Sequence, residues 1–153
     1  MQTDPSLDRA SGVLRIPLIA VREPGVTRRH VLSILDLSAE EVTYLCRRAL
    51  ALKHAKADPQ TLRGRTVGVY FRKTSTRTRT GFMVGAGRLG ATTVYFGPSE
   101  LQTNTGETLE DTARTLAGYL DVLVMRTNES VEEMRIFASH PSMSVVNALS
   151  SDE

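Results

Sequence analysis

A short polar segment near the middle of the chain gathers several kinds of phosphate-binding side chain. It runs from Arg72 to Thr80 and reads Arg-Lys-Thr-Ser-Thr-Arg-Thr-Arg-Thr. Hydroxyl, guanidinium and ammonium groups all bind phosphate, and the start of a helix would add free backbone N–H groups. The segment therefore predicts an anion-binding loop. From its chemistry alone, a solvated turn, a kinase substrate site and a nucleic-acid contact remain alternatives.

Two glycine-based nucleotide motifs do not account for this loop. It is not a P-loop, because the glycine spacing and the Gly-Lys-Ser/Thr ending are missing. The run Gly85 to Gly90 has the letters of a dinucleotide fingerprint. However, it falls at the end of a predicted helix rather than between a strand and a helix. We interpret it as close packing and a helix C-cap.

Apolar periodicity places the polar loop between a strand and a helix. Residues 66–71 form a short apolar run rich in β-formers, which is typical of a buried strand. After the loop, Phe82, Ala86 and Leu89 recur at helical spacing and stop at Gly90. Further strands are predicted at 92–96, 122–125 and 143–146.

Capping patterns predict where three other helices begin. The pairs are Ser38 with Glu41, Thr108 with Asp111, and Ser130 with Glu133. The first of these helices should run to about Lys56, and its apolar face includes Cys46, which we interpret as a core residue. Strands that alternate with helices predict an α/β fold, a three-layer αβα arrangement with a central, mainly parallel sheet of about four strands.

The predicted sheet indicates where a ligand would bind. Ligands of open α/β sheets lie at the carboxyl ends of the strands. The polar loop follows the first predicted strand, and Arg126 follows the third. We therefore expect the loop and Arg126 to meet at one edge of the sheet.

Composition excludes several classes of protein. The chain has 153 residues, of which 41% are hydrophobic, so it can form one domain with a core. No apolar run is long enough to span a membrane, and a net charge of +2 does not support a nucleic-acid surface. A single cysteine excludes an internal disulfide and fits a reducing cytoplasm. Residues 1–30 are broken by proline and glycine and are predicted to be an N-terminal extension. His30 and His54 have no partner pattern and are expected to be exposed, whereas His140 is expected at the surface or a helix end.

The polar loop belongs to a pattern that resembles one enzyme family. Phe71 to Arg79 is similar to the carbamoyl-phosphate signature of the aspartate/ornithine carbamoyltransferases. Blocks at 106–114, 121–126 and 145–149 resemble later segments of that family in the same order. The resemblance covers about residues 30–153. It implies that residues 31–153 form a Rossmann-like carbamoyl-phosphate-binding domain and that the family's C-terminal acceptor-binding domain is absent from this chain.

The resemblance also implies a reaction and the residues that serve it. Family members transfer a carbamoyl group from carbamoyl phosphate to an amine and release phosphate. The residues implied to bind carbamoyl phosphate are Ser75, Thr76, Arg77, Thr78 and Arg126, with Arg77 and Arg126 as the catalytic pair. Arg79 is expected to face the protein. The resemblance implies no metal and no organic cofactor. It also implies a cytoplasmic homotrimer, or a multiple of one, in which the loop near 99–106 enters a neighbouring site.

Several local features favour ornithine as the acceptor. Lys73 and the segments 111–114 and 147–150 resemble the ornithine type, and Thr105 stands where aspartate-type members carry a lysine. Citrulline formation and arginine biosynthesis are the implied roles. Acetylornithine, putrescine and other amines stay open, because the second domain mainly selects the acceptor. The alternative is a stand-alone, non-catalytic module that binds phosphate or carbamoyl phosphate or that regulates. The isolated chain is predicted to be inactive.

Overall fold

The fold is built around a parallel sheet. A computed structural model describes residues 29–55 and 59–152. The strands are β1 (Thr66–Phe71), β2 (Thr92–Phe96), β3 (Val122–Arg126) and β4 (Ser144–Leu149). They lie in the order β2-β1-β3-β4, and every pairing between neighbours is parallel. The predicted α/β sheet is confirmed, and the last two strands extend further toward the C-terminus than the sequence suggested.

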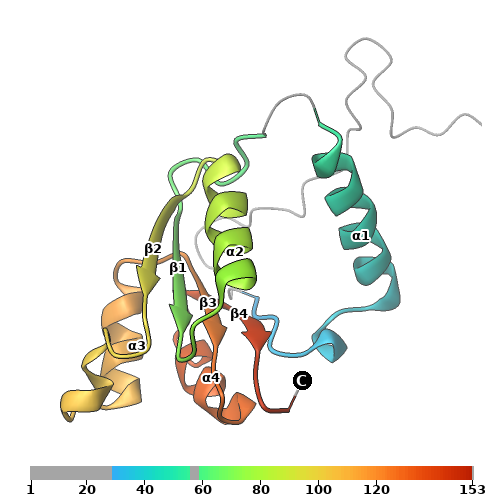
Figure 1. The fold of residues 1–153 in the computed structure, drawn as a ribbon. Coiled ribbons are helices and arrows are strands. Elements are labelled where there is room, and N and C mark those ends of the chain that lie inside the picture. The colour runs from blue at the N-terminus through green and yellow to red at the C-terminus, as the bar shows by residue number, and fades with distance from the viewer. Residues whose placement is uncertain (1–28, 56–58, 153) are drawn as a thin grey trace, which may run out of the picture.

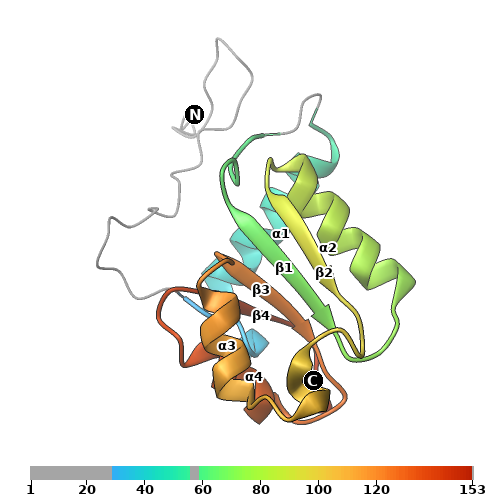
Figure 2. The same ribbon diagram turned by 90° about the vertical axis from the view of Figure 1, so that its left-hand side faces the viewer.

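Helices cover both faces of this sheet. The α-helices of the described residues are α1 (Ala39–Lys53), α2 (Thr76–Arg88), α3 (Leu109–Ala117) and α4 (Val131–Ala138). Two short 3-10 turns, η1 (Ile34–Asp36) and η2 (Gln102–Thr105), precede α1 and α3. Figure 2 shows α2 on one face and α3 and α4 on the other, which confirms the three layers. None of these described helices is long and apolar enough to cross a membrane.

Period-two alternation along the strands supplies one core on each face. On one face, Met125 of β3 is fully buried and packs in a cluster with Phe137 of α4. On the other face, Phe71 of β1 is fully buried and packs with Phe82 of α2. Tyr70 belongs to the first cluster and Phe71 to the second. Successive residues at the carboxyl end of β1 therefore point to opposite faces of the sheet.

Helix α1 differs from the prediction in its packing. It ends at Lys53 instead of near Lys56, and none of its residues is buried. Figure 1 shows α1 set apart from the sheet, beyond α2. Cys46 is exposed, so its interpretation as a core residue was wrong. The amphipathic pattern predicted the helix correctly, but such a pattern does not say what covers the apolar face.

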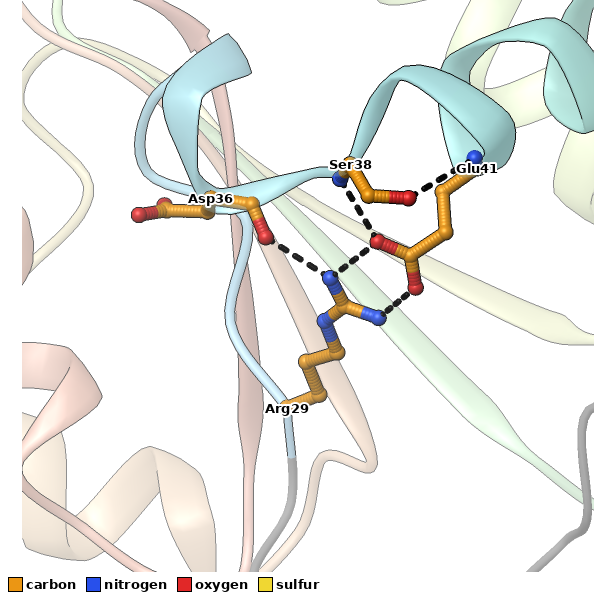
Figure 3. Close-up of polar contacts among 4 residues, drawn as sticks. All are labelled: Arg29, Asp36, Ser38 and Glu41. Carbon is orange, nitrogen blue, oxygen red and sulfur yellow. Dashed lines mark hydrogen bonds and ion pairs between the residues drawn. The ribbon is translucent and has the colours of Figure 1, made fainter.

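The start of α1 is fixed by a small polar cluster (Figure 3). Ser38 is the N-cap: its hydroxyl accepts a hydrogen bond from the Glu41 N–H at 3.2 Å, and the Glu41 carboxylate accepts one from the Ser38 N–H at 2.8 Å. This confirms the predicted capping box. Arg29 donates to both Glu41 oxygens and, at 2.7 Å, to the backbone carbonyl of Asp36. Arg29 thereby ties α1 to the turn that precedes it.

Candidate anion-binding site

The candidate site lies where the connections of the sheet diverge. From β1 the chain crosses one face through α2 to reach β2, whereas α3 and α4 cross the other face. The divergence falls between β1 and β3, and the carboxyl ends of such strands are the usual place for a ligand in these sheets. Phe71 is opposite Arg126 in register, and the Arg72 N–H donates to the Arg126 carbonyl at 2.9 Å. The structure thus brings the polar loop and Arg126 to one edge, as the sequence predicted.

The N-terminus of α2 is the part of this edge best suited to an anion. Ser75 is the N-cap, in an extended conformation, but its side chain makes no capping hydrogen bond. The first turn of α2 also contains no acidic residue. The first N–H groups of a helix have no partner within the helix and carry its positive partial charge. At α2 these groups therefore remain available to a ligand or to water.

The predicted ligand side chains lie at this N-terminus and at the end of β3. Ser75 and Thr78 are half-buried, whereas Thr76 and Arg77 are exposed, and Arg126 is half-buried at the end of β3. Within the described residues, neither Arg77 nor Arg126 makes a hydrogen bond or an ion pair with another side chain. Guanidinium groups without carboxylate partners in the protein are available to bind an anion. That these residues bind a ligand remains a prediction.

Arg79 has a different environment. Its guanidinium carbon lies 4.9 Å from the centre of the Tyr95 ring on β2, in a cation–π arrangement. The side chain therefore packs against the protein, as expected, and holds α2 against β2. Lys73 is exposed in the loop before α2.

A buried carboxylate on the opposite face was missed by the sequence analysis. Glu133 was predicted to complete a capping box with Ser130, and this was wrong. Ser130 accepts a hydrogen bond from the Glu132 N–H instead. The Glu133 carboxylate turns inward, accepts a hydrogen bond from Thr127 Oγ1 at 2.8 Å and forms an ion pair with Arg72 at 3.3 Å. A capping-box pattern constrains only spacing, so no sequence signal distinguished the inward carboxylate from a surface cap.

Electrostatics support a charged Arg72 at this place. Its Nε donates to the Tyr70 hydroxyl at 3.3 Å. This hydrogen bond, followed by the carboxylates of Glu133 and Glu129, raises the pKa of Arg72 above its ordinary value, although burial acts against them. The guanidinium therefore stays protonated beside the buried carboxylate.

The histidines and the glycine run take no part in this edge. His30 is half-buried rather than exposed, because its Nδ1 accepts a hydrogen bond from the Val145 N–H at 3.1 Å. Burial lowers its pKa below the ordinary 6.5. His54 is exposed and His140 follows the end of α4, both as predicted. Gly90 has a left-handed φ of +92°, which confirms the C-cap interpretation. Gly85 and Gly87 face open space, so close packing does not explain them.

No group of three or more metal-ligating side chains that could hold a metal ion occurs in the part of the chain that the structure describes. The groups that gather at the edge are instead donors and cations. Such a set is suited to holding phosphate in place through charge-assisted hydrogen bonds.

Comparison with known proteins identifies the family. Residues 29–153 match the model of the aspartate/ornithine carbamoyltransferase carbamoyl-phosphate-binding domain. An ornithine carbamoyltransferase of a Psychrobacter species is 39% identical over 127 residues, which cover 81% of this chain and 41% of that protein. The ornithine carbamoyltransferase of Methanosarcina acetivorans is 43% identical and covers 82% of this chain and 42% of its own length. The chain belongs to the aspartate/ornithine carbamoyltransferase family.

A solved structure agrees with this assignment. The crystal structure of the anabolic ornithine carbamoyltransferase from Campylobacter jejuni matches with a TM-score of 0.73 and 34% identity, over 80% of this chain and 40% of that one. The chain therefore spans about two fifths of the length of these relatives. Its fold and sequence correspond to their carbamoyl-phosphate-binding domain.

Proposed function

We propose that this chain binds carbamoyl phosphate at the N-terminus of α2 and serves as the donor-binding part of a carbamoyltransferase that acts on ornithine. The observation that carries the proposal is the α2 N-terminus, which has neither a side-chain cap nor an acid in its first turn. Ser75, Thr76, Arg77 and Thr78 surround it, and Arg126 lies at the same edge of the sheet. The ornithine acceptor rests on the resemblance of Lys73 and its flanking segments and on relatives that are ornithine carbamoyltransferases.

The proposed chemistry suits an array of fixed donors. The amine nitrogen of ornithine attacks the carbonyl carbon of carbamoyl phosphate, and the bond between that carbon and the phosphate oxygen breaks. The products are citrulline and phosphate, and the proton lost by the amine leaves with the phosphate. Negative charge grows on the leaving phosphate during this step. Donors already in position therefore stabilise the transition state more than the ground state.

The remaining parts of the proposal concern the whole protein. We propose a homotrimer, or a multiple of one, in which the loop near 99–106 enters a neighbouring site, and a role in arginine biosynthesis in the cytoplasm. Neither a metal nor an organic cofactor takes part. Light scattering at high micromolar concentration checks the assembly: a trimer mass is expected, and a monomer alone would contradict it.

Titration calorimetry with phosphate and with carbamoyl phosphate tests the binding site. Arg77→Ala should weaken both ligands by about ten- to a hundredfold, because a hydrogen bond to a charged group contributes roughly 1.5–3 kcal/mol. Arg63→Ala is the matched control, since it removes an exposed guanidinium before the amino end of β1. Equal affinity of the parent and Arg77→Ala would overturn the proposed site.

A further inference from the structure

One buried carboxylate contacts residues that flank both parts of the proposed phosphate site. Glu133 belongs to α4, and its side chain is only 6% exposed. Its Oε2 accepts a hydrogen bond from Thr127 Oγ1 at 2.8 Å. Its Oε1 lies 3.3 Å from Arg72 Nε. Thr127 Oγ1 in turn accepts a hydrogen bond from the Glu129 N–H at 3.0 Å, so the hydroxyl is held from both sides.

The two residues that Glu133 holds are neighbours of the proposed ligands. Arg72 is the first residue after β1 and opens the loop that leads to Ser75. Thr127 directly follows Arg126, and its own N–H donates to the Leu149 carbonyl at 3.0 Å. A single side chain from the opposite face of the sheet therefore fastens the segment before α2 and the segment that carries Arg126.

The contact with Arg72 depends on charge more than on hydrogen bonding. Arg72 Nε donates to the Tyr70 hydroxyl, and Glu133 Oε1 has no hydrogen bond among the described residues. Attraction between the two charges is then what holds the guanidinium beside this oxygen. Removing the charge of Arg72 leaves the buried Glu133 carboxylate unpaired, which is far more disruptive than losing an exposed ion pair. Removing the charge of Glu133 instead frees a guanidinium whose side chain is 30% exposed.

We infer that Glu133 is a positioning residue of the phosphate site, which fixes the loop before α2 relative to Arg126 by binding Arg72 and Thr127 together. The inference rests on the proposed function, because it assigns Glu133 a role in that same site. Glu133 does not touch the ligand in this role. Its effect reaches the ligand through the place at which Ser75, Arg77 and Arg126 are held.

Glu133→Gln is the main test, because it keeps the shape and an acceptor for Thr127 but removes the charge that holds Arg72. Phosphate affinity is measured by calorimetry at a temperature where circular dichroism shows each variant to be folded. Glu133→Gln should weaken phosphate binding by about three- to tenfold, as expected for loosening rather than removing contacts to a charged ligand. Glu132→Gln is the matched control, since Glu132 is the exposed neighbour on α4 and pairs with Arg135. The Glu132→Gln variant should bind phosphate with the affinity of the parent.

Substitutions of Arg72 separate positioning from stability. Arg72→Gln should weaken phosphate binding to a similar extent, and adding Glu133→Gln to it should cause little further loss. Arg72→Lys, which keeps the charge, should recover most of the affinity. A residue that only stabilises the fold would lower the thermal midpoint while the folded variants kept the parent affinity. If Glu133→Gln does not fold, the contrast between Arg72→Gln and Arg72→Lys decides the question.

The outcomes distinguish this inference from the proposed function. A parent chain that does not bind phosphate, or an Arg77→Ala variant that binds as well as the parent, overturns the proposed function and the inference with it. A parent that binds, with Arg77→Ala impaired but Glu133→Gln and Arg72→Gln unaffected, overturns the inference alone. Independent, additive losses from Glu133→Gln and Arg72→Gln would also overturn it.

Discussion

The helices α1 and α2 both begin at a serine N-cap, but the N–H groups of their first turns are satisfied differently. Each has a serine N-cap in an extended conformation, Ser38 and Ser75 respectively. In α1 the serine hydroxyl and the Glu41 carboxylate satisfy each other's backbone N–H groups, and Arg29 neutralises the acid. In α2 the serine makes no capping bond, and the residues that follow are threonine and arginine. The comparison teaches that α1 uses its first N–H groups within the chain, whereas those of α2 are left available to an anion.

The largest expected effect is on the rate of citrulline formation by this chain, because the proposed role of α2 is limited to the donor. We propose that α2 binds the donor, and we have assigned none of the described residues to an acceptor amine. We predict that this chain, assayed by itself with carbamoyl phosphate and ornithine, forms citrulline at least about a thousandfold more slowly than a complete family enzyme. The reason is that holding both reactants in register can supply roughly 7–11 kcal/mol of the barrier.

A colorimetric citrulline assay measures this rate, and a complete ornithine carbamoyltransferase provides the reference. Phosphate binding by the same preparation, measured by calorimetry, is the control for a functional donor site. A citrulline rate near that of the reference would show that the active site has been misplaced.

The next prediction concerns a variant in which α2 gains the capping box that α1 has. Thr78 is three residues after Ser75, as Glu41 is three after Ser38. Thr78→Glu should therefore complete a capping box and raise the free energy of unfolding by about 0.5–1 kcal/mol. The new carboxylate would also occupy the donors and repel the ligand. Calorimetry should show phosphate affinity reduced by more than about a hundredfold, since a lost charged contact and a like charge act together.

Thr80→Glu is the control for this change, because Thr80 is exposed on the same helix but lies beyond the first turn. It adds the same charge without reaching the first N–H groups, so its effect on phosphate affinity should be much smaller. Unchanged phosphate binding by Thr78→Glu would mean that the α2 N-terminus is not the anion site.

Much of the fold followed from the sequence, because local signals and global architecture agree. The strands β1 and β2 occupy the residues predicted for them, since short β-rich apolar runs between turn residues have few alternatives. The loop and Arg126 share an edge because parallel strands place their carboxyl ends together. The failures concern side chains whose partners are distant in sequence. Cys46 is exposed because no other described element packs against its face of α1. Glu133 contacts Arg72, 61 residues away in the sequence, and His30 contacts Val145, 115 residues away, and no local pattern encodes such contacts.

A smaller effect distinguishes the two serines. Ser38→Ala should lower the free energy of unfolding by about 1 kcal/mol, because it removes a capping hydrogen bond, and it should leave phosphate affinity unchanged. Ser75→Ala should do the reverse: its cost in stability stays below about 0.5 kcal/mol, and phosphate binding weakens by about two- to tenfold. Urea denaturation and calorimetry provide both numbers. Equal losses of stability in the two variants would show that Ser75 also acts as a cap.

The smallest expected effect is a pH dependence at the start of α1. The hydrogen bond from Arg29, followed by that from the Ser38 N–H, lowers the pKa of Glu41 from 4.5 to about 2. Because the folded pKa lies below the unfolded one, the unfolded chain takes up the proton more readily. The stabilisation by Glu41 is therefore complete above pH 4.5 and is lost as the pH falls from 4.5 toward 2. Since the pair is exposed, the effect on stability should be small and should shrink further with salt.

Carboxyl-carbon NMR titration of Glu41 tests this directly. In Arg29→Gln the Glu41 pKa should move back toward 4.5, the value in the absence of these contacts, while the Ser38 hydrogen bond keeps it somewhat below. Phosphate affinity near neutral pH should not change, because Glu41 is ionised there with or without Arg29 and belongs to the helix start that is already satisfied. If the Glu41 pKa stays at about 2 in Arg29→Gln, the capping box alone lowers it. The difference between the two helix starts would then come only from the Ser38–Glu41 capping box, which has no counterpart in α2. The arginine that neutralises Glu41 would not contribute to it.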